Sequence, residues 1–351
     1  MKNPVDLTTT NDIKRILVIR WSALGDVVIA SAVLEDISHA FPSCEIHLNT
    51  SSAHKHLFEN DPRFTKILTP EVRKGGLRGI RDWLCQVRSC HYDLIIDLQC
   101  NDRSRLLIIL LLLSGQRIPY RAGNKKRFPY NYYPLHTPPR RQAIQVFMDI
   151  ARSVGVTPFS ERPVLHIPEQ SYENARKLTA KHALKAGHYA VLFPGSQAGG
   201  YLKRWGATRY AKLAQILHEQ GIQVTLIGGP DDTNECDTIK RDCGEWLINL
   251  CSQTQILDII PLCEQACFII SNDTGTAHIA SATEQPMVVI CGPTDPRRVK
   301  PCGDNAKTIQ ADLPCINCYR KECSHHSCMP AITPEQVLDT LGAEIIAACS
   351  N

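Results

Sequence analysis

The sequence lacks the features of an exported or membrane-spanning protein. Its first fifteen residues are mostly polar, and the apolar stretch ILVI that follows them is too short for a signal peptide. The longest apolar run, at 106–113, has eight residues, whereas a helix that crosses a bilayer needs about 20. We therefore expect a cytoplasmic protein in which this run forms a buried helix. A helix that lies on a membrane surface is the alternative interpretation.

The sequence also lacks a strong charge of one sign. Its net charge is only +4, which by itself does not indicate a nucleic-acid-binding protein. A hydrophobic content of 43% and a charged content of 21% are ordinary for a globular protein, and 351 residues suffice for two domains. Sixteen cysteines without an export signal indicate a reducing compartment and mostly free thiols.

Strand-like and helix-like segments alternate along both halves of the chain. ILVI, CEIHLNTS and YDLIIDLQ are typical of strands in the first half, and YAVLFPGS, QVTLIGGP, CFIIS and PMVVICGPTDP in the second. Helical patterns separate these strands, as in a doubly wound parallel sheet. A Pro-rich stretch at 153–169 divides the halves. We therefore predict an α/β protein with two Rossmann-like domains whose parallel sheets face each other across a cleft.

Four loops that follow predicted strands carry polar residues. The first, SALGD, places Asp26 at the start of a helix. The others, in the second half, are PGSQAGGYLKRWG, GGPDD and SNDTGTAH, at 194–206, 228–232 and 271–278. Ligands of parallel sheets bind where the strands end, and a helix N-terminus attracts anions. Hydroxyls, backbone N–H groups and a lysine in these loops suit a diphosphate.

The turn after CFIIS has two interpretations. Asn272 and Asp273 are good helix N-cap residues, and Thr274 and Gly275 then fall in the first turn. An ordinary capped helix, with His278 buried in the core, explains this pattern. A ligand site at the helix N-terminus explains it equally well.

These motifs resemble those of the bacterial heptosyltransferases, glycosyltransferase family nine, which have the two-domain fold called GT-B. LGDVVIASAVL is similar to the opening loop and helix of the family, and PGS…KRW to its phosphate-side loop. The most specific match is SNDTGTAHIASA followed by VICGPTDP, because the family carries D-T-G-x-x-H and then G-P-T-D/S-P. The likeness covers nearly the whole chain, including the cysteine-bearing tail.

The domain boundaries that we expect follow this organisation. Residues 1–160 form an acceptor-side Rossmann-like domain, and residues 161–332 form the nucleotide-sugar-binding domain. We expect a C-terminal helix at about 333–351, with a Thr N-cap and Pro at its first position, that packs back on the first domain.

The resemblance implies an inverting, metal-independent transfer of heptose from ADP-heptose to the inner core of lipopolysaccharide. Asp26 is then the general base for the acceptor hydroxyl, and Lys203 pairs with the donor diphosphate. No metal ligand and no cofactor besides the nucleotide-sugar donor are expected, because Lys203, a helix dipole and backbone N–H groups meet the leaving charge. The donor-binding residues that the resemblance implies are Ser196, Thr254, Asp273, Thr274, Gly275 and His278.

A basic stretch at 117–141 holds seven Arg or Lys, five aromatic residues and no Asp or Glu. A solvated loop and an RNA-binding segment are both compatible with this composition. In such an enzyme an anionic glycolipid acceptor would dock there, at the cytoplasmic face of the inner membrane, and we expect no nucleic-acid partner. The candidate acceptor-binding residues are Lys125, Lys126, Arg127, Arg140 and Arg141.

The segment CINCYRKECSHHSC stays open between two interpretations. Cys315 and Cys318 begin it as in a zinc knuckle, but the four-residue spacings to Cys323 and Cys328 are less usual for zinc. Free or oxidisable thiols are the alternative, and the resemblance implies no metal there.

Two rival functions fit the same fold. A nucleotide-sugar 2-epimerase would need extra acids at the second-domain site and no basic acceptor surface, so the stretch at 117–141 counts against it. A non-catalytic homologue that binds nucleotide or glycan is disfavoured because Asp26 and Lys203 are both present.

Overall fold

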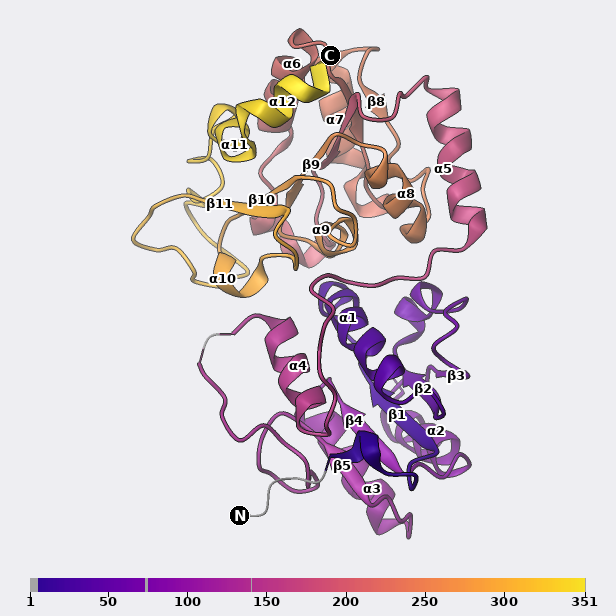
Figure 1. Ribbon diagram of the computed structural model, residues 1–351. Helices are drawn as coiled ribbons and strands as arrows, with labels where there is room; N and C mark the ends of the chain where they lie inside the picture. The colour runs from indigo at the N-terminus through magenta and orange to yellow at the C-terminus, as the bar shows by residue number, and fades with distance from the viewer. Residues whose placement is uncertain (1–5, 73–74, 140, 351) are drawn as a thin grey trace. The chain divides into compact units, whose positions relative to one another are not determined.

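The structure, a computed structural model, describes residues 6–72, 75–139 and 141–350. It divides into two compact units, Met1–His166 and Ile167–Asn351, so the division falls slightly after the predicted boundary at 160. Each unit contains one parallel sheet with helices packed around it (Figure 1). This is the predicted α/β architecture.

The first unit has a five-stranded sheet in the order β3-β2-β1-β4-β5, and all of its strand pairs are parallel. Its strands are β1 (Arg15–Ile19), β2 (Glu45–Asn49), β3 (Lys66–Leu68), β4 (Leu94–Asp97) and β5 (Tyr120–Ala122). Its α-helices are α1 (Leu24–Ala40), α2 (Gly76–Arg88), α3 (Asp102–Leu113) and α4 (Ala143–Arg152), and its short 3₁₀ segments are η1 (Leu7–Thr9) and η2 (Ser52–Leu57).

The second unit has a six-stranded parallel sheet in the order β11-β10-β9-β6-β7-β8. Its strands are β6 (Tyr189–Phe193), β7 (Gln223–Leu226), β8 (Ile248–Asn249), β9 (Phe268–Asn272), β10 (Met287–Cys291) and β11 (Ala306–Gln310). Its α-helices are α5 (Glu169–Lys181), α6 (Ala207–Glu219), α7 (Thr233–Cys243), α8 (Ile259–Glu264), α9 (Gly275–Ala280), α10 (Pro296–Val299), α11 (Pro334–Leu341) and α12 (Ala343–Ser350), and its 3₁₀ segments are η3 (Ala198–Lys203), η4 (Pro230–Asp232) and η5 (Ile256–Asp258).

Strand order fixes where each unit can hold a ligand. In the first sheet the chain reverses its direction of winding between β1 and β4, and in the second between β6 and β9. Loops that follow such neighbouring strands lead to opposite faces of the sheet and leave a crevice between them. The loops predicted to carry chemistry after β1, β6 and β9 all lie at these two positions.

The C-terminal segment differs from the prediction. Instead of packing back on the first unit, α11 packs on α6, β10 and β11, and Val337, Leu338 and Leu341 join the core of the second unit. Its apolar face therefore belongs to the second sheet. Cys349 in α12 forms a disulfide with Cys267, whereas the sequence predicts mostly free thiols.

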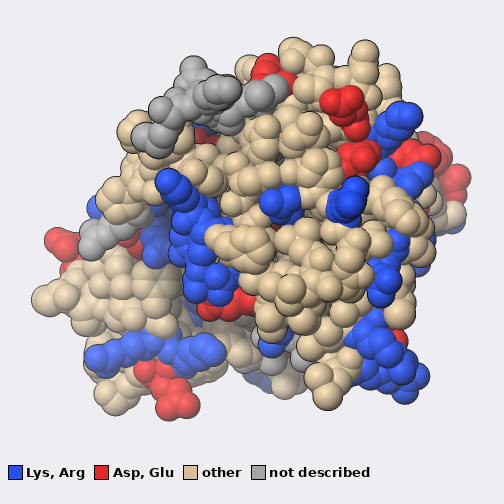
Figure 2. Space-filling view, turned by 90° about the horizontal axis from the view of Figure 1, so that it is seen from below, with Lys and Arg blue, Asp and Glu red and all other residues tan. Residues whose placement is uncertain are grey.

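Helix α3 is only half buried, although its apolar run predicted a buried helix. One side, with Leu107, Ile108 and Leu111, lies in the core of the first unit, while Leu106 and Leu113 are 49% and 77% exposed. Figure 2 views the molecule from the side on which α3 lies in Figure 1, and it shows more Lys and Arg than Asp and Glu between broad uncharged areas. Among the described residues, no helix has the length and apolarity to cross a membrane.

A buried arginine fixes α1, the helix that carries Asp26. The side chain of Arg63 is 4% exposed and forms an ion pair with Asp61, whose side chain is 0% exposed. Its Nη1 also donates to Glu35 Oε2 at 2.9 Å and to the carbonyl of Ser31 at 3.1 Å, both in α1. One guanidinium group therefore joins α1 to the segment around Asp61.

Replacing this guanidinium tests its importance. We expect Arg63→Met to lower the free energy of unfolding by about 3–5 kcal/mol, because the buried Asp61 and its neighbour Glu35 lose their guanidinium partner. Urea denaturation measures the change. Arg78→Met is the matched control, since Arg78 is 83% exposed and its loss should change stability by less than about 0.5 kcal/mol. Equal effects of the two substitutions would contradict this account.

Candidate functional site

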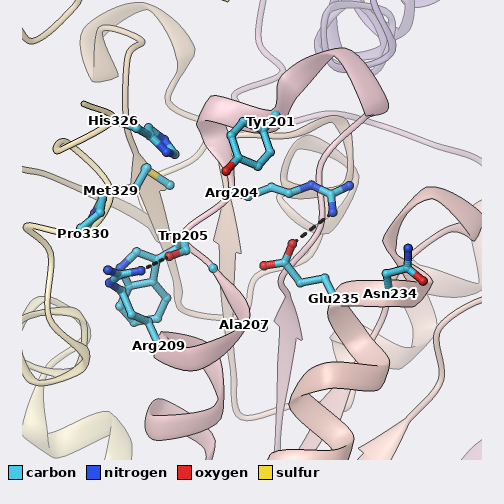
Figure 3. A pocket seen from close by; sticks show the side chains of 11 residues that line it. Tyr201, Arg204, Trp205, Ala207, Arg209, Asn234, Glu235, His326, Met329 and Pro330 are labelled. Atoms are coloured by element: carbon cyan, nitrogen blue, oxygen red, sulfur yellow. Dashed lines mark hydrogen bonds and ion pairs between the residues drawn. The ribbon is translucent and has the colours of Figure 1, made fainter. Parts of the chain in front are cut away.

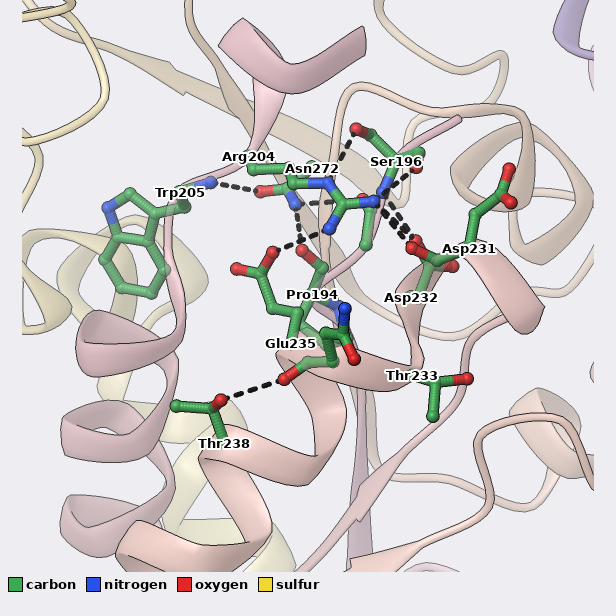
Figure 4. Close-up of polar contacts among 12 residues, drawn as sticks. Pro194, Ser196, Arg204, Trp205, Asp231, Asp232, Thr233, Glu235, Thr238 and Asn272 are labelled. Atoms are coloured by element: carbon green, nitrogen blue, oxygen red, sulfur yellow. Dashed lines mark hydrogen bonds and ion pairs between the residues drawn. The ribbon is translucent and has the colours of Figure 1, made fainter. Parts of the chain in front are cut away.

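The loops after β6 and β9 are joined by one buried amide. Asn272, the last residue of β9, is 0% exposed, and its Nδ2 donates to the carbonyls of Pro194 and Gly195 at 2.7 and 3.0 Å. Its Oδ1 accepts from the backbone N–H of Trp205 at 3.3 Å and from Tyr210 Oη at 3.1 Å. Figure 4 shows Asn272 between these segments. Its predicted role as a helix N-cap is therefore wrong, because the side chain ties strand and loops together.

The helix after β9 begins three residues after Asn272. Thr274 is the N-cap of α9, Gly275 is its first residue, and both are half-buried. Thr274 Oγ1 forms a hydrogen bond with Thr276 Oγ1 at 2.7 Å. The first N–H groups of a helix have no carbonyl partner within it, so hydroxyls and backbone donors gather at this partly open edge.

Lys203 and Asp273 form an ion pair, although the sequence suggested separate roles for them. Lys203 Nζ lies 2.7 Å from Asp273 Oδ2, and the two side chains are 29% and 4% exposed. Thr294 Oγ1 donates to the same oxygen at 2.7 Å. Asp273 is therefore a buried acceptor that orients Lys203, while the ammonium group remains partly open to an anion. Thr294 was missed as a site residue, although it belongs to the quoted GPTDP motif.

The loop after β6 is held by Arg204, the neighbour of Lys203. Its guanidinium donates to Ser196 Oγ at 3.2 Å, to Asp232 Oδ1 at 3.2 Å and to Glu235 Oε2 at 3.1 Å (Figure 4). Ser196, predicted to meet phosphate, is buried, and its Oγ also donates to the carbonyl of Gly200 at 3.0 Å. In this structure the Ser196 hydroxyl therefore shapes the loop.

The close approach of this loop to η4 requires a glycine at 195. A Cβ at Gly195 would lie 1.9 Å from the carboxyl carbon of Asp232. That carboxylate cannot move away cheaply, because it accepts from the N–H groups of Ser196 and Gly229, both at 3.0 Å. Burial raises the pKa of Glu235 in the adjoining helix, and Arg204 opposes that shift.

The last two predicted donor residues differ in position. His278 is in α9, the helix that Gly275 begins, and it is 7% exposed. Thr254 is half-buried in the turn between β8 and η5, two strands beyond β6 in the sheet order. The structure thus gathers Ser196, Lys203, Asp273, Thr274 and Gly275 at the switch point and leaves Thr254 toward the sheet edge.

In the first unit, Asp26 is oriented by a buried arginine. Arg20 Nη2 lies 2.7 Å from Asp26 Oδ2, and the two side chains are 6% and 43% exposed. Arg20 also donates to the carbonyls of Leu98 and Ser22, and its guanidinium lies 4.9 Å from the centre of the Phe147 ring. Burial lowers the pKa of Arg20, and Asp26 opposes this shift. The carboxylate is therefore held in place and still reaches solvent.

Part of the basic stretch is structural. Tyr130 is buried, and its hydroxyl donates to Asp97 Oδ2 at 2.6 Å. Burial raises the pKa of Asp97, while this bond and the N–H groups of Cys100 and Gln99 act against the shift. Arg121 Nε donates to the carbonyl of Pro129 at 2.7 Å, so this arginine closes its own loop.

The five predicted acceptor residues differ in their surroundings. Lys125, Lys126 and Arg127 are exposed in the loop after β5. Arg141 is 11% exposed and forms an ion pair with Asp149 of α4, so its charge is already partnered. Arg140 lies outside the described residues.

Two cavities lie beside the loop after β6. The larger, about 360 Å³, is lined by Arg204, Trp205, Arg209 and Glu235 on one side and by His326 and Met329 on the other (Figure 3). The smaller, about 250 Å³, is lined by His325, His326 and the four cysteines of the tail. Neither includes a residue that was predicted for catalysis or for donor or acceptor binding. Among the described residues, no group of three or more His, Cys, Asp or Glu side chains is arranged to hold a metal ion.

Comparison with known proteins gives a consistent result. Residues 81–329 match the model of glycosyltransferase family 9 (heptosyltransferase). The chain is 34% identical to lipooligosaccharide heptosyltransferase 2 of Campylobacter jejuni over 91% of this chain and 95% of that protein.

Two solved structures share the fold. The glycosyl transferase family 9 protein of Veillonella parvula matches with a TM-score of 0.80 and 21% identity over 99% of each chain. Escherichia coli ADP-heptose lps heptosyltransferase II matches with a TM-score of 0.72 and 23% identity, over 95% of this chain and 98% of that one. At such low identity these structures bear on the fold alone, and they confirm the predicted fold class.

Asn272→Ala tests whether this amide holds the site together. The substitution leaves two buried carbonyls and the Trp205 N–H without their partner, and each unsatisfied group costs about 1–3 kcal/mol. We expect the free energy of unfolding to fall by at least about 3 kcal/mol, measured by thermal or urea denaturation. Gln170→Ala, which removes an exposed amide from α5, should have little effect. An Asn272→Ala variant as stable as this control would show that the loops hold their positions without it.

Proposed function

The chain belongs to glycosyltransferase family 9, the heptosyltransferase family, and we propose that it transfers heptose from ADP-heptose to the inner core of lipopolysaccharide with inversion and without a metal ion. Heptosyl transfer in the synthesis of the lipopolysaccharide core follows from the family and from the curated relatives. The nucleotide, the stereochemistry and the independence from metal are our proposal. The E. coli structural relative is named for ADP-heptose, which supports the choice of donor.

The observation that carries the proposal is the group at the end of β9. A lysine that is 29% exposed stands beside the start of α9, where Thr274 and Gly275 offer a hydroxyl and backbone donors. Such a group suits a diphosphate. We propose that the diphosphate lies here and that the nucleoside extends toward Thr254. Asp273 is 4% exposed and pairs with Lys203, so we propose that it acts on the donor through Lys203 and not through the direct contact with heptose hydroxyls that the resemblance implies.

The proposed chemistry needs stabilisation of a leaving group. As the anomeric bond breaks, positive charge develops on the sugar and negative charge on the departing diphosphate. Lys203 and the backbone donors oppose that negative charge in positions fixed before the reaction begins, which is the electrostatic contribution expected of an enzyme. We propose that these protein groups make a divalent ion unnecessary.

The acceptor hydroxyl must lose a proton as it attacks. Asp26 is a candidate base, because its carboxylate is 43% exposed and Arg20 fixes its orientation. A single displacement, in which the hydroxyl attacks the face opposite the leaving group, inverts the anomeric centre. We propose that the exposed Lys125, Lys126 and Arg127 attract the anionic acceptor. Arg141 instead forms its ion pair with Asp149 of α4.

A direct assay tests the whole proposal. The purified protein is incubated with ADP-heptose and a set of truncated core acceptors, with and without EDTA, and ADP release and the anomeric configuration of the product are measured. We expect ADP release that depends on the acceptor, survives EDTA and gives an inverted product. Activity that is lost in EDTA and restored by magnesium or manganese would overturn the metal-free mechanism.

Lys203→Ala tests the diphosphate site. Losing one charge-assisted contact costs about 1.5–3 kcal/mol, so affinity for the nucleotide sugar should fall by roughly 10- to 150-fold. Titration calorimetry measures it. Lys212→Ala, in α6, is the control, because Lys212 is 60% exposed and pairs with Glu335. The double variant Lys203→Ala/Asp273→Asn removes the buried carboxylate that the first change would leave unpaired. Unaltered affinity in both Lys203 variants would rule out the role.

Asp26→Asn tests the general base. General-base catalysis contributes typically about 10²–10⁴-fold, so kcat should fall by that factor while donor affinity stays the same. Stability should change by less than about 1 kcal/mol, because the pair is partly solvated and the amide oxygen still accepts from Arg20. The measurement combines kcat, nucleotide affinity and Tm on one preparation. Near-normal kcat would exclude Asp26 as the base, and global unfolding would mark it as structural.

A further inference from the structure

The outer face of α3 is apolar although it is exposed. Leu106 and Leu113 are 49% and 77% exposed, and Ile109 and Leu110 between them are partly exposed. These four residues have the spacing i, i+3, i+4 and i+7, so they form one stripe along the helix. The stripe lies opposite Leu107 and Leu111, which are in the core. The second half of α3 is therefore apolar on all sides, and only one side is buried.

Basic residues lie near both ends of this stripe. Between 102 and 128 the sequence has seven Arg or Lys and one acid, Asp102. Arg103 and Arg117 are exposed near the two ends of the helix. Arg127 Nη1 lies 3.4 Å from Asp102 Oδ1, which brings the loop after β5 to the start of α3. In that loop Phe128, 65% exposed, follows Lys125, Lys126 and Arg127.

We propose that α3 and the loop at 124–128, together called the α3 face, dock on an anionic lipid bilayer. The leucines and Phe128 enter the boundary between headgroups and acyl chains, and the basic side chains meet lipid phosphates. Figure 2 shows the excess of Lys and Arg on this side of the molecule. Because the α3 face alone supports this inference, it does not depend on the proposed donor. Its biological use, reaching a lipid-anchored acceptor, rests on the proposed function.

Charge and the aromatic residues favour a bilayer over other partners. A second copy of the chain would bring two positive faces together, which is unfavourable without intervening anions. Single-stranded RNA would need several exposed aromatic rings for base stacking. Phe128 is exposed, but Tyr130 is buried and the rings of Tyr120 and Tyr132 pack edge to face with their centres 5.9 Å apart. A negatively charged bilayer offers acyl chains to the apolar stripe and phosphates to the basic residues near it.

Vesicle sedimentation with the full chain tests the inference. The wild type is mixed with phosphatidylcholine vesicles with or without phosphatidylglycerol, at low and high salt. We expect binding to the anionic vesicles only, weakened by salt because the charged contacts are screened. Leu106→Asn/Leu113→Asn should bind at least about tenfold more weakly, because two apolar side chains no longer enter the bilayer. Leu113→Asn alone gives a second, milder variant.

The matched control is Phe159→Asn, which removes an exposed aromatic residue, 58% exposed, elsewhere in the first unit. It should bind vesicles like the wild type, and all variants should keep the wild-type Tm because the replaced side chains are exposed. Equal vesicle binding by wild type and both leucine variants would overturn the proposal. A wild-type dimer in gel filtration that the leucine variants convert to monomer would also overturn it, since a second copy would then cover the face.

Transfer assays separate this inference from the proposed function. With a detergent-solubilised acceptor, the leucine variants should release ADP at the wild-type rate, whereas with the acceptor in anionic vesicles they should be slower. If vesicle binding is lost as expected but no variant or wild type releases ADP from ADP-heptose, the proposed donor is wrong and the docking face stands.

Discussion

The carboxamide of Asn272 is the contact on which the arrangement of the second unit depends. It presents two donors and an acceptor oxygen in one plane, and all are used by segments that are far apart in the sequence. A carboxylate at this position would repel the carbonyls of Pro194 and Gly195, and an apolar side chain would leave them without donors. Asp273 follows Asn272 in the chain, and Lys203 lies two residues before Trp205, whose N–H donates to Asn272. The hydrogen bonds of this amide therefore help to position both charged groups.

Each unit contains an ion pair in which one side chain is buried and the other is partly exposed. A side chain that is almost fully buried, Asp273 or Arg20, orients an opposite charge that remains partly exposed, Lys203 or Asp26. Other hydrogen bonds hold the orienting partner in place: Thr294 donates to Asp273, and Arg20 donates to two backbone carbonyls. The exposed group that pairs with it therefore keeps little rotational freedom. Charges arranged in this way need little reorganisation when a ligand arrives, which is how preorganised sites lower a barrier.

The sequence allowed the fold to be predicted because strand and helix periodicities are local. The ends of strands could be proposed as the candidate site because parallel sheets place their carboxyl ends together. What could not be predicted depends on partners distant in the chain. The bonds of Asn272 to Pro194, the pairing of Arg141 with Asp149 and the packing of α11 on the second sheet are examples. The exposure of one side of α3 is another, since an apolar run does not reveal which of its sides has a neighbour.

The packing of α11 has a consequence for folding during synthesis on the ribosome. Val337, Leu338 and Leu341 complete the core beside β10 and β11, and α11 follows all the strands of this sheet in the order of translation. The first unit, which ends at His166, is translated before α11 and can fold while translation continues. The sheet of the second unit stays partly uncovered until α11 has emerged. Nascent chains that stop before Pro334 would therefore carry a folded first unit and a protease-sensitive second unit.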